Sequence, residues 1–236
     1  MLTIRPKSLI LDLDGTLYPS TVGIEFMLRR RFRKLAADLT GLPEADVYPL
    51  VKYGRERYGH GVMALHEQYN IQPEDFLERI YTEIDHSPIT VYDGLAEILS
   101  LLARRIPLYL LTNSNRSFTH RVLAHLKITS HFSLVQSIED SSFHLKPDPQ
   151  AYKILEKRTA LDPPSTLVVD DSYRNLETAT KLGFPTALVS NQVSSPPTFW
   201  EMHEQRHHEA PNWVSCASHS VVDLLSQVYT LLQESD

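Results

Sequence analysis

Polar side chains that could do chemistry follow three short apolar runs of this sequence. These side chains are Asp12, Asp14, Thr112, Asn113, Ser114, Asp170 and Asp171. Short apolar runs are typical of buried strands, and the carboxyl ends of parallel strands form the edge of the sheet where ligands bind. Carboxylates crowded in one pocket repel one another and are tolerated mainly when they share a hard divalent cation such as Mg²⁺. The pattern therefore predicts a magnesium site suited to phosphoryl chemistry.

The elements that must position these residues alternate between strands and helices after residue 91. Apolar runs predict strands over 9–11, 108–111, 133–137, 166–169 and 186–189. Helical periodicity predicts helices over about 94–105, over about 117–126 and over 221–232, and a further helix that includes Tyr152, Ile154 and Leu155. Repeated strand–helix units predict an α/β fold, with a Rossmann-like, mostly parallel sheet flanked by helices.

Residues 20–90 read as helices without a convincing strand. A helical stripe ended by Gly41 consists of Ile24, Leu28, Phe32, Leu35 and Leu39. Pro43 and Pro73 mark the first turns of two further helices, and the segments 52–54 and 59–61 are placed between them. The sequence thus predicts a helical cap over 20–90, inserted into a core made of 1–19 and 91–236.

A polar, proline-interrupted segment over 191–212 predicts a long surface excursion. It contains His203 and His207, one helical turn apart, and His208. A metal site on these histidines is an alternative, but a solvated face is favoured because no carboxylate or cysteine completes the ligand set.

Composition limits the classes of protein that the sequence can encode. The chain has 236 residues, a formal net charge of −6 and a single cysteine, Cys216, so no intramolecular disulfide can form. The net negative charge disfavours general nucleic-acid binding. We expect no secretory leader, because Asp12 and Asp14 interrupt the only early apolar run, and no later run approaches membrane-spanning length. We expect a cytoplasmic protein without nucleic-acid or membrane partners, either a monomer or a homodimer.

Four motifs of the sequence resemble, in order and spacing, those of the haloacid dehalogenase-like phosphohydrolases. They are Asp12-Leu13-Asp14-Gly15-Thr16, Thr112-Asn113-Ser114, Lys146-Pro147 and Asp170-Asp171-Ser172. The resemblance implies a helical cap between the first and second motifs. Residues 14–19, 52–54 and 169–175 look more narrowly like the pyrimidine 5′-nucleotidase branch, in which asparagine is often found at the position of Gly15.

The resemblance also implies a role for each motif residue. Asp12 is the implied nucleophile, which forms an aspartyl-phosphate, and Asp14 the implied acid and base for the leaving group and the attacking water. Lys146 is implied to neutralise both phosphate and nucleophile. The implied phosphate ligands are Thr112, Asn113, Ser114 and Lys146; the implied Mg²⁺ ligands are Asp12, the backbone carbonyl of Asp14, Asp171 directly and Asp170 through water; the implied loop supports are Ser172 and Asn175.

The expected activity is Mg²⁺-dependent hydrolysis of a small phosphate monoester. The resemblance around residues 52–54 implies a pyrimidine nucleoside 5′-monophosphate as substrate. The cap also offers Tyr53, Tyr58, His60 and His66, which could contact a planar ring. The alternatives are a sugar-phosphate phosphatase or phosphomutase, a lysophosphatidate phosphatase and a catalytically retired binding protein. A dehalogenase is disfavoured, because the dehalogenases of this superfamily dispense with metal and lack the second aspartate, here Asp14.

Overall fold

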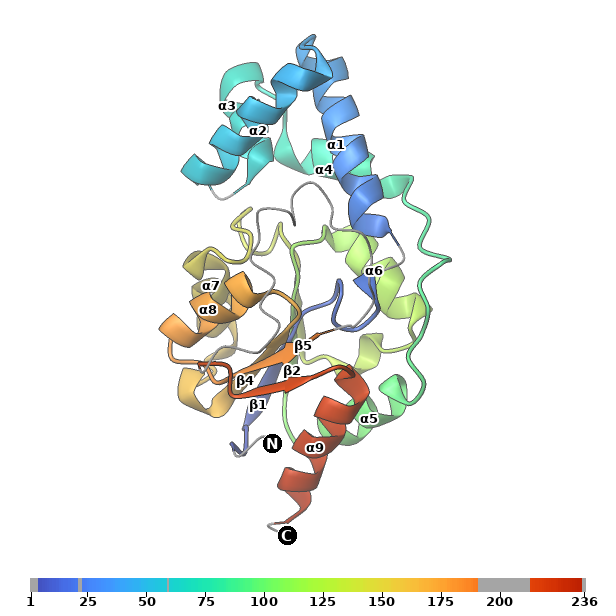
Figure 1. The fold of residues 1–236 in the computed structure, drawn as a ribbon, viewed down its shortest axis with the longest axis vertical. Helices are drawn as coiled ribbons and strands as arrows, with labels where there is room; N and C mark the ends of the chain where they lie inside the picture. The colour runs from blue at the N-terminus through green and yellow to red at the C-terminus, as the bar shows by residue number, and fades with distance from the viewer. Residues whose placement is uncertain (1–3, 21–22, 59, 191–212, 235–236) are drawn as a thin grey trace.

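A parallel six-stranded sheet forms the centre of the molecule (Figure 1). The structure is a computed structural model that describes residues 4–20, 23–58, 60–190 and 213–234. The strands are β1 (Ser8–Leu11), β2 (Leu108–Leu111), β3 (Leu134–Gln136), β4 (Thr166–Asp170), β5 (Thr186–Val189) and β6 (Cys216–Ser218). Their spatial order is β3-β2-β1-β4-β5-β6. The order reverses between β1 and β4, so these two neighbours form the switch point at which open α/β sheets bind ligands.

Helices cover both faces of the sheet because alternate residues of β1 point to opposite sides. Leu9 and Leu11 belong to a buried cluster with residues of α5 (Leu95–Ala103), α6 (Arg116–His125) and α9 (Val221–Gln233). Ile10 belongs to a second cluster with residues of α7 (Pro149–Thr159) and α8 (Tyr173–Lys181). Two short 3₁₀ helices, Thr129–His131 and Pro163–Ser165, lie in the connections. The result is a three-layer sandwich whose central strand is shielded on both faces.

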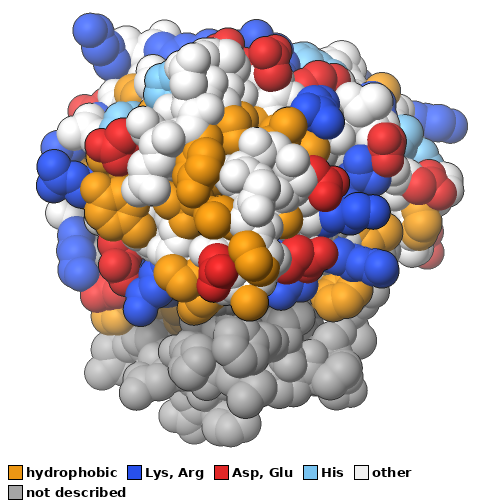
Figure 2. All heavy atoms as spheres, turned by 90° about the horizontal axis from the view of Figure 1, so that it is seen from above, with side chains coloured by type: hydrophobic (Ala, Val, Ile, Leu, Met, Phe, Trp, Pro, Cys, Tyr) orange, Lys and Arg blue, Asp and Glu red, His pale blue; other side chains and the backbone are white. Residues whose placement is uncertain are grey.

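Four further helices gather at one end of the molecule, opposite α9 (Figure 1). They are α1 (Ile24–Thr40), α2 (Glu44–Tyr58), α3 (Gly61–Tyr69) and α4 (Pro73–Thr82). We call this layer the cap. Viewed from that end, side chains of both charges surround a group of hydrophobic and uncharged ones (Figure 2). The cap is attached to the core through α4, because the Arg121 guanidinium of α6 donates to the carbonyls of Tyr81, at 2.6 Å, and Thr82, at 3.2 Å.

The structure confirms the predicted α/β sheet and all five predicted strands. The sequence analysis did not predict β6, which is short and carries small side chains, nor α3 and α8. Placing residues 52–54 between helices was wrong, because they lie inside α2. The helices of the cap fall within the predicted 20–90 segment, although the division into two domains stays a prediction.

Two further expectations concern the segment 191–212 and the presence of membrane-spanning helices. The expected excursion over 191–212, with His203, His207 and His208, lies outside the described residues. In the part of the chain that the structure describes, no helix combines the length and apolar character needed to span a bilayer.

The helices α2 and α3 approach each other closely at two glycines. A Cβ atom on Gly54 would lie 2.8 Å from the Ala64 Cβ and 2.9 Å from the carbonyl oxygen of Gly61. A Cβ atom on Gly61 would lie 2.5 Å from the Val51 Cγ1. The absence of side chains at both positions thus allows the two helices to pack against each other.

Gly54→Ala is expected to destabilise the protein. Overpacking of a rigid contact costs about 1–3 kcal/mol, which outweighs the gain of roughly 1 kcal/mol from replacing a helical glycine by alanine. Urea unfolding measures the change in the free energy of unfolding. The matched control is Lys52→Ala on the same helix, where the side chain is 58 % exposed and the change should stay within about 0.5 kcal/mol. A Gly54→Ala protein as stable as the control contradicts the packing argument.

Candidate active site

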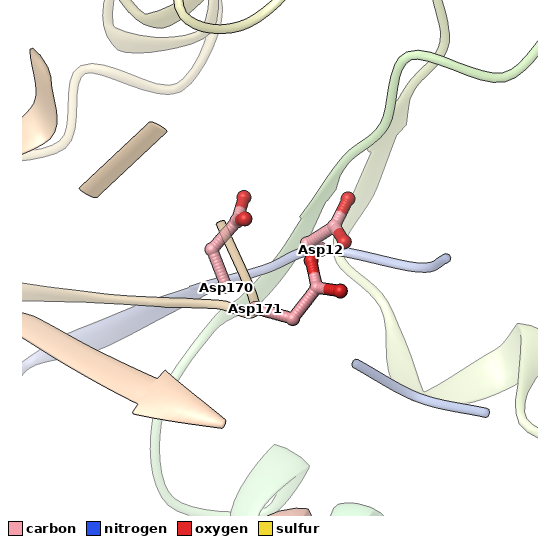
Figure 3. Close-up of side chains that lie close together, drawn as sticks. All are labelled: Asp12, Asp170 and Asp171. Atoms are coloured by element: carbon pink, nitrogen blue, oxygen red, sulfur yellow. The ribbon is translucent and has the colours of Figure 1, made fainter. Parts of the chain in front are cut away.

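Three aspartates from neighbouring strands come together at the switch point. Asp12 follows β1, Asp170 ends β4 and Asp171 follows it, and the register Leu11↔Val169 places Asp12 beside Asp170. Carboxylate oxygens of the three residues lie within 4.8 Å of one another. Figure 3 shows their side chains around a common space at the carboxyl ends of the strands. The predicted meeting of the first and last motifs is therefore present in the folded chain.

The ammonium group of Lys146 joins two of these aspartates. Its Nζ atom lies 2.6 Å from the Asp12 Oδ1 and 2.8 Å from the Asp170 Oδ2, and all three side chains are buried. Burial alone would lower the pKa of Lys146, but the charges of Asp12 and Asp170 outweigh burial and raise it. Lys146 is therefore a permanent cation and not a base.

The pKa of Asp12 is raised to about 7, because burial and the repulsion from Asp170 and Asp14 together outweigh the opposing charge of Lys146. Near neutral pH the carboxyl of Asp12 therefore needs more positive charge than Lys146 supplies if it is to stay fully ionised. A divalent cation beside Asp12 would provide that charge.

Two asparagines hold the charged groups in place. Asn113 makes a pair of hydrogen bonds to the backbone of Lys146: its Oδ1 accepts from the Lys146 N–H at 2.8 Å, and its Nδ2 donates to the Lys146 carbonyl at 3.0 Å. Asn175 donates to both oxygens of Asp170, at 3.0 and 3.1 Å, and the Ser172 N–H donates to one of them at 2.9 Å. Ser172 and Asn175 thus occupy the supporting positions that the sequence predicted, whereas the Asn113 side chain supports the loop of Lys146.

The three-aspartate group fits a divalent cation. Three ionised carboxylates and one ammonium group have a net charge of −2, which one Mg²⁺ would neutralise. Asp171 closes the group by lying directly against Gly15, where an added Cβ atom would come within 2.0 Å of the Asp171 Oδ2. Gly15 also has a φ of +84°, which a side chain disfavours. The cation ligands implied by the resemblance are therefore available, and Asp14 would add only its backbone carbonyl.

The side chain of Asp14 lies in different surroundings from that of Asp12. Its carboxylate accepts hydrogen bonds from the Ser114 hydroxyl at 2.8 Å, from the Thr112 hydroxyl at 3.2 Å and from the phenol of Tyr18. Burial raises the pKa of Asp14, and these three hydrogen bonds limit the rise. A carboxyl with a raised pKa, surrounded by neutral hydroxyls, is suited to giving and taking a proton.

Thr112 and Ser114 are linked to each other as well as to Asp14. The Ser114 N–H donates to the Thr112 Oγ1 at 3.0 Å. The implied role of Thr112, Asn113 and Ser114 in holding phosphate stays a prediction, since the hydrogen bonds of their side chains run to Asp14, to Lys146 and to one another.

Two tyrosines beside Asp14 had no predicted role. Tyr18 is fully buried, and its phenol contacts the Asp14 carboxylate directly. Its position two residues after the first motif was the feature of the sequence that could have indicated this contact. Tyr81 belongs to α4 of the cap; burial and the nearby charge of Asp14 raise the pKa of its phenol, whereas an interaction with Ser114 lowers it. Its sequence position looks like that of any buried residue of an amphipathic helix, so only the fold could associate it with the site.

The cap residues expected to contact a planar ring are engaged within the cap. Tyr58 donates to Glu67 at 2.6 Å and packs edge-on against Tyr53. The His60 Nδ1 accepts from the Val62 N–H at the start of α3, and burial lowers the pKa of His60 to about 3. His66 contacts the carbonyl of Ile71 at 3.2 Å. These contacts explain the four residues without a ligand.

Gly15→Ala is expected to displace Asp171 and weaken cation binding by about 10–100-fold, as changes to the supporting residues of a metal site typically do. Calorimetric titration with Mg²⁺ measures the effect, and the melting temperature shows that the chain is folded. The matched control is Gly41→Ala, which shares a positive φ of +73° but has no neighbour within 4 Å. Equal Mg²⁺ affinity in the two variants contradicts the assigned role of Gly15.

Comparisons with known proteins agree with this geometry. The family model of the haloacid dehalogenase-like hydrolases matches residues 6–192. The chain is similar to phosphoglycolate phosphatase of Rhodospirillum rubrum, with 28 % identity over 81 % of this chain and 83 % of that protein. It is also similar to N-acetylmuramic acid 6-phosphate phosphatase of Pseudomonas putida, with 26 % identity over 79 % of this chain and 83 % of that one.

A solved structure shares the whole architecture. L-2-haloacid dehalogenase of Xanthobacter autotrophicus superposes with a TM-score of 0.60 at 20 % identity, over 94 % of this chain and 98 % of that one. At this identity the likeness concerns the fold alone. The family model spans all four motifs, from the aspartates after β1 to those after β4. The chain therefore belongs to the haloacid dehalogenase-like hydrolases.

Proposed function

We propose that the protein is a divalent-cation-dependent phosphatase that hydrolyses small phosphate monoesters through an aspartyl-phosphate. The observation that carries the proposal is the pairing of Asp12, in contact with Lys146, with a second carboxyl, Asp14, in separate hydroxyl-rich surroundings. A nucleophile and an acid two residues apart, each in its own environment, are what a two-step transfer of a phosphoryl group needs.

In the first step an ionised oxygen of Asp12 forms a bond to phosphorus while the bond from phosphorus to the leaving oxygen breaks. Asp14 gives its proton to that leaving oxygen, so an alcohol departs. In the second step Asp14 takes a proton from water, whose oxygen attacks the phosphorus and releases inorganic phosphate and the free Asp12 carboxylate. After the first step Asp12 carries the phosphoryl group and Asp14 is ionised; the second step breaks the bond from Asp12 to phosphorus and returns the proton to Asp14, so the cycle closes.

Lys146 and the cation supply the electrostatic part of the reaction. Lys146 remains charged throughout and faces the nucleophile, where it counters the negative charge of the incoming phosphate. A bound Mg²⁺, held by Asp12, Asp171 and Asp170, would offset the charge on the phosphoryl oxygens and keep Asp12 ionised at neutral pH. Asn175 and Asn113 keep Asp170 and Lys146 in position for this task.

Attack on phosphorus is favoured over attack on carbon. Asp14 and the pair Asp170 and Asp171 provide the proton donor and cation ligands that phosphate esters require. The two sequence relatives described above also carry phosphatase names. A phosphomutase would use the same residues and differ in passing the phosphate to a second hydroxyl.

The relatives favour a small organic phosphate of the phosphoglycolate or sugar-phosphate type as substrate. A pyrimidine nucleoside 5′-monophosphate is the second candidate, favoured by the similarity of residues 14–19, 52–54 and 169–175 to that branch. Two observations make it weaker. The close approach of Asp171 leaves no room at Gly15 for the asparagine common in that branch, and the cap residues expected to hold the base contact other groups of the cap.

Asp12→Asn is expected to reduce phosphate release by at least about a thousandfold, because the amide oxygen is a poor nucleophile. Release of inorganic phosphate from the phosphoglycolate and sugar-phosphate esters is the measurement, with melting temperature as the check on folding. Asp38→Asn, an exposed change in α1, is the matched control and should keep wild-type activity. Activity within tenfold of wild type in Asp12→Asn excludes Asp12 as the nucleophile.

Removal of divalent cations is expected to abolish turnover, and Mg²⁺ to restore it. Mg²⁺ should also raise the melting temperature, since a ligand at 100 times its Kd that binds only the folded state adds about 2.7 kcal/mol to the free energy of unfolding. Asp171→Asn should reduce that thermal shift because it removes one ligand charge. Full activity in excess EDTA contradicts the proposed cation site.

A further inference from the structure

Tyr81 is where the cap reaches the proton-donating side of the active site. It lies in the last turn of α4 and is only 8 % exposed. Its ring centroid is 5.3 Å from that of Phe118 in α6, on the core. Its carbonyl accepts a hydrogen bond of 2.6 Å from the Arg121 guanidinium of the same core helix. Both ends of the residue are thus bound to the core.

The phenol of Tyr81 lies beside the acid. Burial raises the pKa of Tyr81, the nearby charge of Asp14 raises it further, and interactions with the Ser114 side chain and the Asn115 backbone lower it. Ser114 in turn donates to the Asp14 carboxylate at 2.8 Å. Ser114 therefore connects the hydroxyl of Tyr81 to the carboxyl of Asp14, which would protonate the leaving group.

Neighbouring contacts hold α4 where it is. Glu78, one turn before Tyr81, accepts a hydrogen bond of 2.9 Å from the Asn115 side chain, and Asn115 is the N-cap residue of α6. The Arg121 guanidinium also donates to the carbonyl of Thr82 at 3.2 Å. Contacts on both sides of Tyr81 therefore tie this turn of α4 to α6.

The position of Asp14 determines what lies next to Tyr81 during the reaction. If Asp14 protonates the leaving oxygen, the leaving alcohol must lie against the Asp14 carboxyl. Tyr18, Thr112 and Ser114 border that carboxyl from the core and bond to it directly. Tyr81 approaches the same carboxyl from the cap, because Glu78 of its helix bonds to Asn115, the residue after Ser114.

We propose that the ring of Tyr81 is a specificity-determining wall that restricts this enzyme to phosphate esters of small alcohols. The inference rests on the proposed phosphatase function and narrows its substrate class. A planar ring packed against Phe118 occupies space that a bulky leaving group such as a nucleoside would need. The size of the ring carries this role, and its hydroxyl adds a contact with Ser114.

The experiment compares wild type with Tyr81→Ala, Tyr81→Phe and Tyr69→Ala. Tyr69 is a cap tyrosine on α3 that is 38 % exposed, so its removal controls for general effects on the cap. Each protein is assayed with Mg²⁺ for kcat/KM on phosphoglycolate, a hexose 6-phosphate and UMP. Ratios of kcat/KM between bulky and small esters report transition-state selectivity and cancel any loss of active protein.

Tyr81→Ala is expected to raise the ratio of UMP to phosphoglycolate at least tenfold, whereas Tyr81→Phe and Tyr69→Ala should leave it within threefold of wild type. A ratio within threefold of wild type in Tyr81→Ala overturns the proposal, and so does an equal change in Tyr81→Phe, which would assign the effect to the hydroxyl. If Tyr81→Ala does not fold, Tyr81→Leu keeps an apolar contact with Phe118 and should still raise the ratio at least threefold. A wild-type protein that releases no phosphate from any ester overturns the proposed function itself, and with it the role of Tyr81.

Discussion

The buried contact of Lys146 with Asp12 and Asp170 is the interaction on which the rest of the site depends. Lys146 lies in the loop before α7, 134 residues after Asp12 at the end of β1 and 24 residues before Asp170 at the end of β4. The contact therefore joins three distant parts of the chain. Buried charges are costly unless they are paired and hydrogen-bonded, and removing one partner of such a pair typically costs about 3–5 kcal/mol. Thr16 donates to the other oxygen of Asp12, and Asn175 and Asn113 bond to Asp170 and to the Lys146 backbone, so the site is built as one connected network.

Asp12 and Asp14 are two residues apart yet occupy opposite chemical surroundings. Asp12 faces an ammonium group and two other carboxylates, so its ionisation depends on the local balance of charges. Asp14 faces three hydroxyls, and its raised pKa comes from burial. Separate surroundings allow one carboxyl to act as a nucleophile and the other as an acid within the same short turn. Gly15 makes this turn possible because its positive φ and missing Cβ admit Asp171.

The cap completes the site through a single well-anchored helix. Arg121 binds the last carbonyls of α4, where the helix dipole is negative, and Asn115 binds Glu78 one turn earlier. These contacts hold Tyr81 near the acid, whereas Tyr53 and Tyr58 of α2 pack against each other and His60 bonds to the start of α3. The helix that is anchored to the core is therefore the part of the cap that reaches Asp14 and its neighbours.

The residues alone predicted the central strands, their parallel arrangement and the convergence of Asp12 with Asp170 and Asp171, whereas the places of Lys146, Ser172 and Asn175 were implied by the family resemblance. The residues alone could do so because short apolar runs followed by polar residues are local patterns, and parallel strands bring their ends to one edge. The sequence did not reveal β6, whose small residues carry no apolar signal, or the pairing of Asn113 with the backbone of Lys146. Nor did it reveal Tyr81 beside Asp14, since 67 residues separate them and helical periodicity marks Tyr81 only as buried. Only the tertiary structure decided these contacts, because they depend on how α4 docks on α6 and not on any local pattern.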